Sequence, residues 1–234
     1  MTLGRKELIV ALDVPSVAEA RELIAKLGDG VGVYKIGLEL LFAGGFALAE
    51  ELAAAGRSVF VDAKLLDIEA TVERATAAIA ATGAEFLTVH ALDRKTLDAA
   101  VRGRGDSALK LLGVTVLTNL APSDLIEQGI DHPLHELVLH RALLAKHAGF
   151  DGVVASGHEA AAIRKAAGPG FLIVTPGVRP QGSATQDQAR AVTPAKAIEA
   201  GADYLVVGRP ITRAPDPHAA AEAIAAEIAS VLSR

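Results

Sequence analysis

Asp62-Ala63-Lys64-Leu65-Leu66-Asp67-Ile68 is the stretch on which the interpretation of this chain rests. It follows Ser58-Val59-Phe60-Val61, a β-branched and aromatic run that is typical of a buried strand. Because side chains alternate along a strand, we expect Asp62 and Lys64 to project to the same side. Opposite charges at the end of an apolar strand are costly unless they are paired or used in chemistry. We therefore expect catalytic groups here. A structural ion pair is the alternative, and the Asp67 carboxylate also suits a helix N-terminus.

Similar apolar runs occur on both sides of this strand, with helix-like stretches between them. The predicted strands cover residues 8–13, 32–37, 58–61, 86–90, 111–117, 152–155, 171–174 and 204–207. The predicted helices cover residues 17–27, 42–55, 68–81, 95–101, 134–147, 158–166, 194–200 and 217–232. Eight strand–helix units in 234 residues indicate an α/β fold, a (β/α)8 TIM barrel forming a single domain over residues 1–234. A doubly wound open sheet is the second possibility.

The composition excludes several classes of function. A net charge of −5 argues against a surface for nucleic acid or anionic membranes. The chain has no cysteine, which excludes disulfides, thiolate catalysis and cysteine-bound metals. No 18-residue apolar run is present, and the first residues lack the apolar region of a signal peptide. We therefore expect a cytoplasmic protein.

Polar residues gather where the predicted strands end. They are Asp13, Lys35, Asp62, Lys64, Thr118, Asn119, the run Thr175-Pro176-Gly177-Val178-Arg179, and Gly208-Arg209. In a (β/α)8 barrel the carboxyl ends of the strands meet on one face, and that face holds the active site. Charges at so many strand ends are hard to explain by stability alone, so we expect one shared site.

The last two strands predict a phosphate site. Loops after the seventh and eighth strands of such barrels often bind phosphate through backbone N–H groups and a helix start. Here these loops supply Arg179 and Arg209, and Gly208 leaves the backbone uncovered. The long polar loop over residues 180–188 is interpreted as a lid, with a solvated insertion as the alternative.

The order of these motifs resembles the orotidine 5′-phosphate decarboxylase family over nearly the whole chain. The resemblance rests on residues 11–13, 35–37, 62–68, 175–179, 187–190, 192–194 and 201–211. The D-x-K-x-x-D-I run of residues 62–68 is specific when it occurs together with P-G-x-R at 176–179 and G-R-P-I at 208–211.

Three positions depart from the usual pattern of that family. Glu69-Ala70 stands where Pro-Asn is common, and Leu92-Asp93 interrupts the usual glycines after His90-Ala91. Thr118-Asn119 replaces Thr-Ser, although an Asn amide can still donate a hydrogen bond to the base. None of these changes removes a charged position of the motif.

The resemblance implies decarboxylation of orotidine 5′-phosphate to uridine 5′-phosphate without a cofactor or metal. Lys64 would stabilise and protonate the carbanion at C6, and Asp62 would lie near the substrate carboxylate. Lys35, Asp62, Lys64 and Asp67 would form an alternating network. The family further implies a homodimer with shared active sites, in which Asp67, Ile68 and Thr71 come from the other subunit.

The resemblance also assigns the substrate-binding residues. Asp13 and Lys35 would bind the ribose hydroxyls. Thr118, Asn119 and Pro176 would lie beside the pyrimidine or ribose. The phosphate would be held by four residues of the last two loops, Arg179, Gln188, Gly208 and Arg209.

Two other functions stay open at this point. A Mg2+-dependent ketose-phosphate decarboxylase or aldolase on the same barrel would need extra carboxylates, and Glu39 is the one candidate near the second strand end. A non-catalytic phosphate-ligand binding protein would keep the arginines without needing Lys64 beside Asp62. The histidines at 132, 135, 140 and 147 do not have the spacing of a tight metal site.

Overall fold

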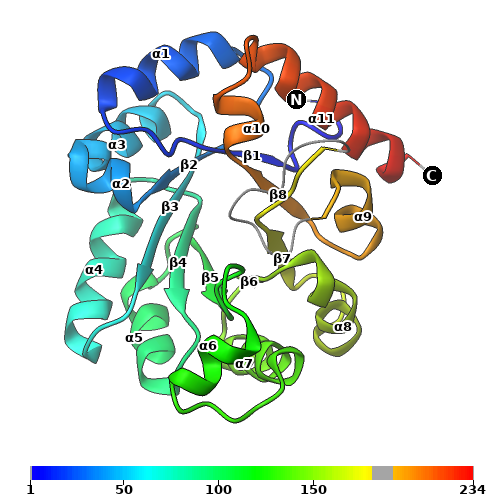
Figure 1. Cartoon of the computed structure of the whole chain (residues 1–234). Coiled ribbons are helices and arrows are strands. Elements are labelled where there is room, and N and C mark those ends of the chain that lie inside the picture. The colour runs from blue at the N-terminus through cyan, green and yellow to red at the C-terminus, as the bar shows by residue number, and fades with distance from the viewer. Residues whose placement is uncertain (1, 181–191, 234) are drawn as a thin grey trace.

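The barrel is closed in the computed structural model, which describes residues 2–180 and 192–233. Its strands are parallel and follow one another in sequence order, and β8 pairs with β1 to close the ring (Figure 1). This arrangement confirms the predicted (β/α)8 barrel. The strands are β1 Leu8–Ala11, β2 Val33–Gly37, β3 Ser58–Leu65, β4 Phe86–His90, β5 Lys110–Val114, β6 Gly152–Val154, β7 Leu172–Thr175 and β8 Tyr204–Val207.

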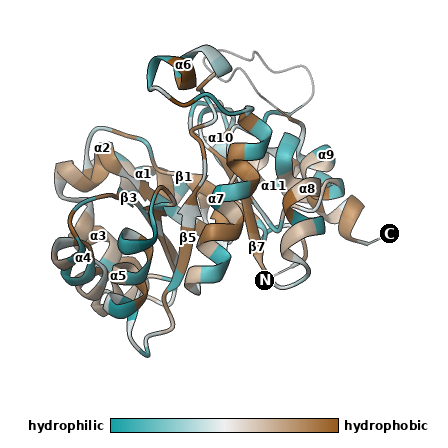
Figure 2. Ribbon diagram, turned by 90° about the horizontal axis from the view of Figure 1, so that it is seen from below, coloured by the Kyte–Doolittle hydropathy of each residue, from teal (hydrophilic) through white to brown (hydrophobic). Residues whose placement is uncertain are grey.

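Helices surround the strands as an outer ring (Figure 1). They are α1 Val17–Leu27, α2 Leu38–Leu40, η1 Leu41–Gly45, α3 Phe46–Ala54, α4 Glu69–Ala81, α5 Arg94–Arg104, α6 Pro122–Glu127, α7 Leu134–Ala148, α8 Gly157–Ala167, α9 Pro194–Glu199, α10 Arg209–Thr212 and α11 Pro217–Leu232. Figure 2 shows α6 standing out beyond the other labelled helices. In the described part of the chain, no helix has the length and apolar character needed to cross a membrane.

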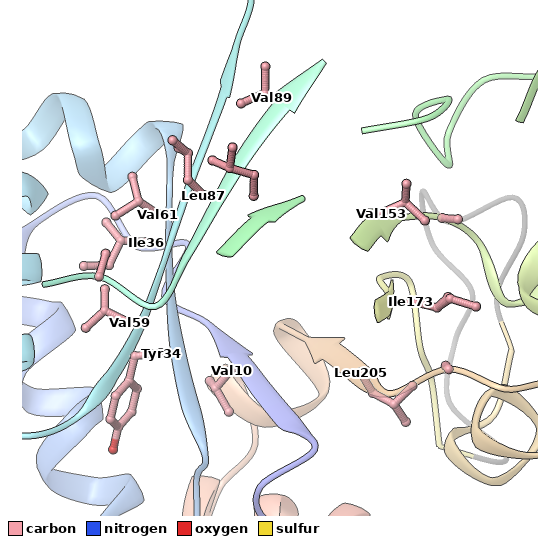
Figure 3. Packing of buried hydrophobic residues seen from close by; sticks show 14 of the residues in the cluster. Val10, Tyr34, Ile36, Val59, Val61, Leu87, Val89, Val153, Ile173 and Leu205 are labelled. Atoms are coloured by element: carbon pink, nitrogen blue, oxygen red, sulfur yellow. The ribbon is translucent and has the colours of Figure 1, made fainter. Parts of the chain in front are cut away.

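Alternation along the strands divides the core into two layers. One layer fills the barrel interior and includes Ile9, Phe60 and Phe86. The rings of Phe60 and Phe86 meet edge to face at a centroid distance of 6.0 Å. The other lies between the strands and the helices, where Figure 3 shows Val10, Tyr34, Ile36, Val59, Val61, Leu87, Val89, Val153, Ile173 and Leu205. Strands buried on both faces need continuous apolar sequence, which is why the strand signal was clear.

The predicted helix over residues 42–55 is wrong in its first part. The chain turns helical earlier, in α2, passes through the π-turn of η1, and only then enters α3. Gly44 has a φ of 94°, which interrupts the regular helix. A Cβ on Gly45 would lie 2.6 Å from the carbonyl oxygen of Leu40, so glycine is required there. The Gly44-Gly45 pair therefore explains the kink.

Two short helices and several strand ends also differ from the prediction. The first strand ends at Ala11 instead of residue 13, and the third continues to Leu65 instead of ending at residue 61. The sequence predicts that the fifth strand reaches residue 117, but β5 ends at Val114, and the sequence pattern does not predict α6 or α10. Both helices are too short to show a clear hydrophobic period, although each begins with a proline in its first turn, a known start signal.

Candidate active site

A cavity of about 490 Å³ opens at the carboxyl ends of the strands. It brings together ten of the predicted site residues: Asp13, Lys35, Asp62, Lys64, Thr118, Asn119, Pro176, Arg179, Gly208 and Arg209. Asp67, Ile68 and Thr71 are not among the residues that line it. Gln188 and most of the expected lid lie outside the described residues. One face of one barrel thus collects charged groups from widely separated parts of the sequence.

A chain of alternating charges crosses the cavity floor. The Lys35 Nζ lies 3.0 Å from Asp13 Oδ1 and 3.3 Å from Asp62 Oδ2. The Lys64 Nζ lies 2.8 Å from the same Asp62 Oδ2. The side chains of Lys35 and Asp62 are 8% and 12% exposed, whereas that of Lys64 is 28% exposed. The outermost ammonium therefore faces the cavity while the inner pair is fixed beneath it.

Burial and charge act in opposite directions on the inner pair. Burial raises the pKa of the Asp62 carboxyl, but Lys35 and Lys64 outweigh this and hold that pKa below its ordinary value. Burial lowers the pKa of Lys35, and Asp62 and Asp13 more than reverse the effect, so that this pKa lies above its ordinary value. Both groups are therefore ionised at neutral pH.

An irregularity in β3 brings Lys64 to this position. Val61 pairs with Leu87 and Leu65 pairs with Val89, so the three residues 62–64 lie opposite Thr88 alone. Lys64 has a φ of 48°, the only positive φ of a non-glycine residue within 2–180 and 192–233. Such a conformation is strained and occurs often at functional sites. The predicted proximity of Asp62 and Lys64 is confirmed, but it arises from a bulge instead of regular alternation.

Several residues of the site were not anticipated from the sequence. Gly37 ends β2, and a Cβ there would come 2.9 Å from both Asp13 Oδ1 and Lys35 Nζ. Thr212 and Arg213 line the cavity beside Arg209. Thr88 bonds to Asp62 from β4, and its position two residues from Phe86 on an interior face was a signal that could have found it.

The residues predicted to bind phosphate line another part of the cavity. Arg179 is 8% exposed, and its Nη1 donates to the carbonyl oxygen of Val178 at 2.9 Å. Gly208 is the N-cap residue of α10, and Arg209 is the first residue of that helix. Two guanidinium groups from adjacent strands therefore border one part of the cavity.

Asp67 lies away from the cavity lining and is exposed. Its Oδ1 accepts a hydrogen bond from the Ile68 N–H at 2.6 Å, directly before α4. The Asp67 carboxylate therefore lies at a helix N-terminus, which the sequence analysis gave as the alternative for this residue. Ile68 beside it is 73% exposed, and Thr71 is half-buried.

The acidic residues of the cavity do not form a metal-binding group. Asp13 and Asp62 are both bound by the Lys35 ammonium, which would compete with a cation, and Glu39 is an exposed residue of the cavity wall. Among the described residues, no three His, Asp or Glu side chains are grouped so that they could hold a metal ion.

Comparison with known families agrees with this geometry. Residues 6–224 match the family described as orotidine 5′-phosphate decarboxylase / HUMPS. The chain belongs to this family. The orotidine 5′-phosphate decarboxylase of Rhodopseudomonas palustris (strain BisB5) is 56% identical over 225 residues, with 96% of this chain and 95% of that protein covered. The protein of the same name from Caulobacter vibrioides (strain NA1000 / CB15N) is 53% identical over 228 residues, covering 96% of this chain and 97% of that protein.

Two solved structures share the architecture of this chain. The crystal structure of orotidine 5′-phosphate decarboxylase from Lactobacillus acidophilus superposes with a TM-score of 0.83 at 39% identity. That match covers 94% of this chain and 98% of the other. A structure titled uncharacterized conserved protein from Geobacillus kaustophilus gives a TM-score of 0.80 at 36% identity, covering 94% of this chain and 99% of the other.

Proposed function

We propose that this protein decarboxylates orotidine 5′-phosphate to uridine 5′-phosphate, the last step of de novo pyrimidine nucleotide synthesis. Membership of the family and the names of relatives more than half identical to this chain support the reaction. The observation that carries the proposal is the Lys64 ammonium, 2.8 Å from Asp62 at the cavity floor.

Lys64 supplies the positive charge and the proton that the reaction needs at C6. Breaking the bond between C6 and the carboxylate releases CO2 and leaves the electron pair on C6, where no simple enolate can form. A fixed ammonium stabilises that charge and then transfers a proton to the carbon. The scheme balances without an oxidant or reductant, and the Lys64 side chain alone supplies the positive charge and the proton that it uses.

Asp62 acts on the substrate carboxylate and on Lys64. The low pKa of Asp62 keeps it ionised, so a second carboxylate placed beside it would be repelled until CO2 leaves. The same carboxylate binds the Lys64 ammonium at 2.8 Å and holds it in place for the proton transfer. Lys35 orients Asp62 from below and joins it to Asp13.

The rest of the nucleotide would bind along the cavity. Asp13 and Lys35 would bind the ribose hydroxyls, and Thr118, Asn119 and Pro176 would contact the pyrimidine side. Arg179, Gly208 and Arg209 would hold the phosphate, together with Gln188 from outside the described residues. The positions of the eight described residues along one cavity support this assignment. Binding energy from the phosphate would help to hold the base against Lys64.

A homodimer with shared sites would explain why Asp67 lies outside the cavity of its own chain. Ile68, Leu66 and Leu38 are 73%, 49% and 46% exposed, and Phe42 is 90% exposed. These apolar side chains follow the neighbouring strands β2 and β3, where a second copy would bury them. Asp67, Ile68 and Thr71 would then reach the partner's cavity. We also infer a cytoplasmic location, which suits an enzyme that acts on a free nucleotide.

The direct test is the loss of orotidine 5′-phosphate absorbance with purified, metal-stripped protein. Turnover that is unchanged by EDTA supports the proposal and separates it from a Mg2+-dependent ketose-phosphate enzyme. Binding of uridine 5′-phosphate without any turnover of orotidine 5′-phosphate would instead support a phosphate-ligand binding protein.

A further inference from the structure

The buried hydroxyl of Thr88 joins the two reactive residues of β3. Thr88 lies in the middle of β4 and its side chain is inaccessible to solvent. Its Oγ1 donates to Asp62 Oδ1 at 2.8 Å and accepts from the Lys64 backbone N–H at 3.0 Å. A carboxylate can only accept and an N–H can only donate, so a single hydroxyl satisfies both groups.

These two hydrogen bonds replace the backbone hydrogen bonds between β3 and β4 that the bulge removes. Residues 62–64 have no ladder partners on β4 because three residues of β3 oppose Thr88 alone. The Lys64 N–H would therefore be a half-buried donor without a backbone acceptor, and Thr88 Oγ1 provides the acceptor. The hydroxyl thus holds the strained φ of Lys64 in place.

The same hydroxyl fixes the rotation of the Asp62 carboxylate. Asp62 Oδ2 receives both ammonium groups, at 2.8 Å from Lys64 and 3.3 Å from Lys35. Asp62 Oδ1 accepts the hydrogen bond from Thr88 Oγ1. With both oxygens bound, the plane of the carboxylate is set, and so is the direction from which Lys64 is held.

We propose that Thr88 is a positioning residue of the decarboxylase, whose hydroxyl sets the orientation of Asp62 and the backbone of Lys64 without touching the substrate. This inference rests on the proposed function. A threonine at this point gives a hydroxyl in a fixed place because its β-branched side chain has little rotational freedom in a strand.

The test compares Thr88→Val with Thr88→Ser. Valine keeps the shape and removes the hydroxyl, whereas serine keeps the hydroxyl. Loss of a hydrogen bond to a buried charge should reduce kcat in Thr88→Val by about 10- to 100-fold. Thr88→Ser should stay within about threefold of the wild type, because both hydrogen bonds can re-form. Thr88→Cys replaces the hydroxyl by a thiol, which is only a weak hydrogen-bond donor and acceptor, and is the second variant if Thr88→Val does not fold.

Thr76→Val is the matched control for burying a valine in place of a threonine. Thr76 is also fully buried, on α4, and its Oγ1 makes no hydrogen bond to any described residue. Because no bond is lost, its kcat should stay within about twofold of the wild type. Affinity for uridine 5′-phosphate should stay within about threefold in every variant, since ribose and phosphate contacts come from other strands.

A pH profile separates positioning from general destabilisation. Asp62 is faced by Lys35 from β2, Lys64 from β3, and Thr88 and His90 from β4. Removing the Thr88 hydroxyl takes away one group that lowers the pKa of Asp62, so the acidic limb of kcat/KM should move to higher pH. Thr88→Ser should keep the wild-type profile.

The results that would overturn the role of Thr88 differ from those that would overturn the proposed decarboxylase activity. The role of Thr88 is overturned, with the activity intact, if Thr88→Val turns over as fast as the wild type and Thr88→Ser and its acidic limb does not move. Thr88→Cys takes the place of Thr88→Val in this comparison if the valine variant does not fold. Absence of orotidine 5′-phosphate turnover in the wild type overturns the activity itself. A loss in Thr76→Val equal to that in Thr88→Val would also overturn the proposal, since the effect would belong to packing.

Discussion

Replacing Lys35 by methionine should destabilise the fold because it leaves Asp62 with one cation instead of two. The Lys35 side chain is 8% exposed and bonds Asp62 Oδ2 at 3.3 Å, whereas its second partner, Asp13, is 56% exposed and can be solvated by water. Breaking a buried pair from one side costs about 3–5 kcal/mol. Since Lys64 still lies 2.8 Å from Asp62, we expect the lower end, about 3 kcal/mol.

The pH dependence of that loss follows from the two pKa shifts. The low pKa of Asp62 stabilises the fold above the ordinary carboxyl range, and this contribution is lost as pH falls through the pKa of the folded state. The raised pKa of Lys35 stabilises the fold below the ordinary lysine range, and that contribution is lost as pH rises through it. The difference between wild type and Lys35→Met should be largest near neutral pH and shrink toward both extremes.

The assay is urea denaturation of both proteins at one fixed concentration across this pH range. Arg21→Met is the matched control, because the ion pair of Arg21 with Glu51 is 2.6 Å long but 56% exposed on each side. The Arg21→Met change should leave the free energy of unfolding almost unchanged, because water and salt screen an exposed ion pair. A loss in Lys35→Met no larger than that of Arg21→Met, or one that does not depend on pH, would refute the reasoning.

Two further predictions concern the phosphate and the dimer. Arg209→Ala should weaken binding of uridine 5′-phosphate by about 2–4 kcal/mol and leave binding of uridine unchanged; titration calorimetry with both ligands measures this, and an equal loss for both would remove Arg209 from the phosphate site. Mixing inactive Asp67→Ala with inactive Lys64→Ala should restore about one quarter of wild-type activity after subunit exchange, since half the dimers would be mixed and each would have one intact site. No recovery, with exchange confirmed by mass labelling, would show that the site is not shared.

The barrel could be predicted because its signals are local and repeated. Strands buried on both faces, such as Leu8–Ala11 and Tyr204–Val207, must be continuously apolar, and the helices between them carry caps such as Ser16. Polar residues at the strand ends then had to meet on one face, so ten of the proposed site residues were found in one cavity.

What the sequence could not predict depends on backbone geometry and long-range pairing. The bulge at residues 62–64 appears only when β3 is aligned with β4, and it is this alignment that gives Thr88 its two partners. The kink before α3 depends on close contact between Gly45 and the carbonyl of Leu40. The position of Asp67 relative to a partner subunit belongs to an assembly and is still a prediction.

The most direct test of the account is the turnover of Lys64→Ala with orotidine 5′-phosphate, measured beside its affinity for uridine 5′-phosphate. In the proposed mechanism Lys64 supplies both the cation and the proton, so kcat should fall by at least about a thousandfold. Affinity for uridine 5′-phosphate should stay within about tenfold, because Arg179, Arg209 and Asp13 are untouched. Turnover within about tenfold of the wild type would contradict the assignment of Lys64 as the catalytic acid.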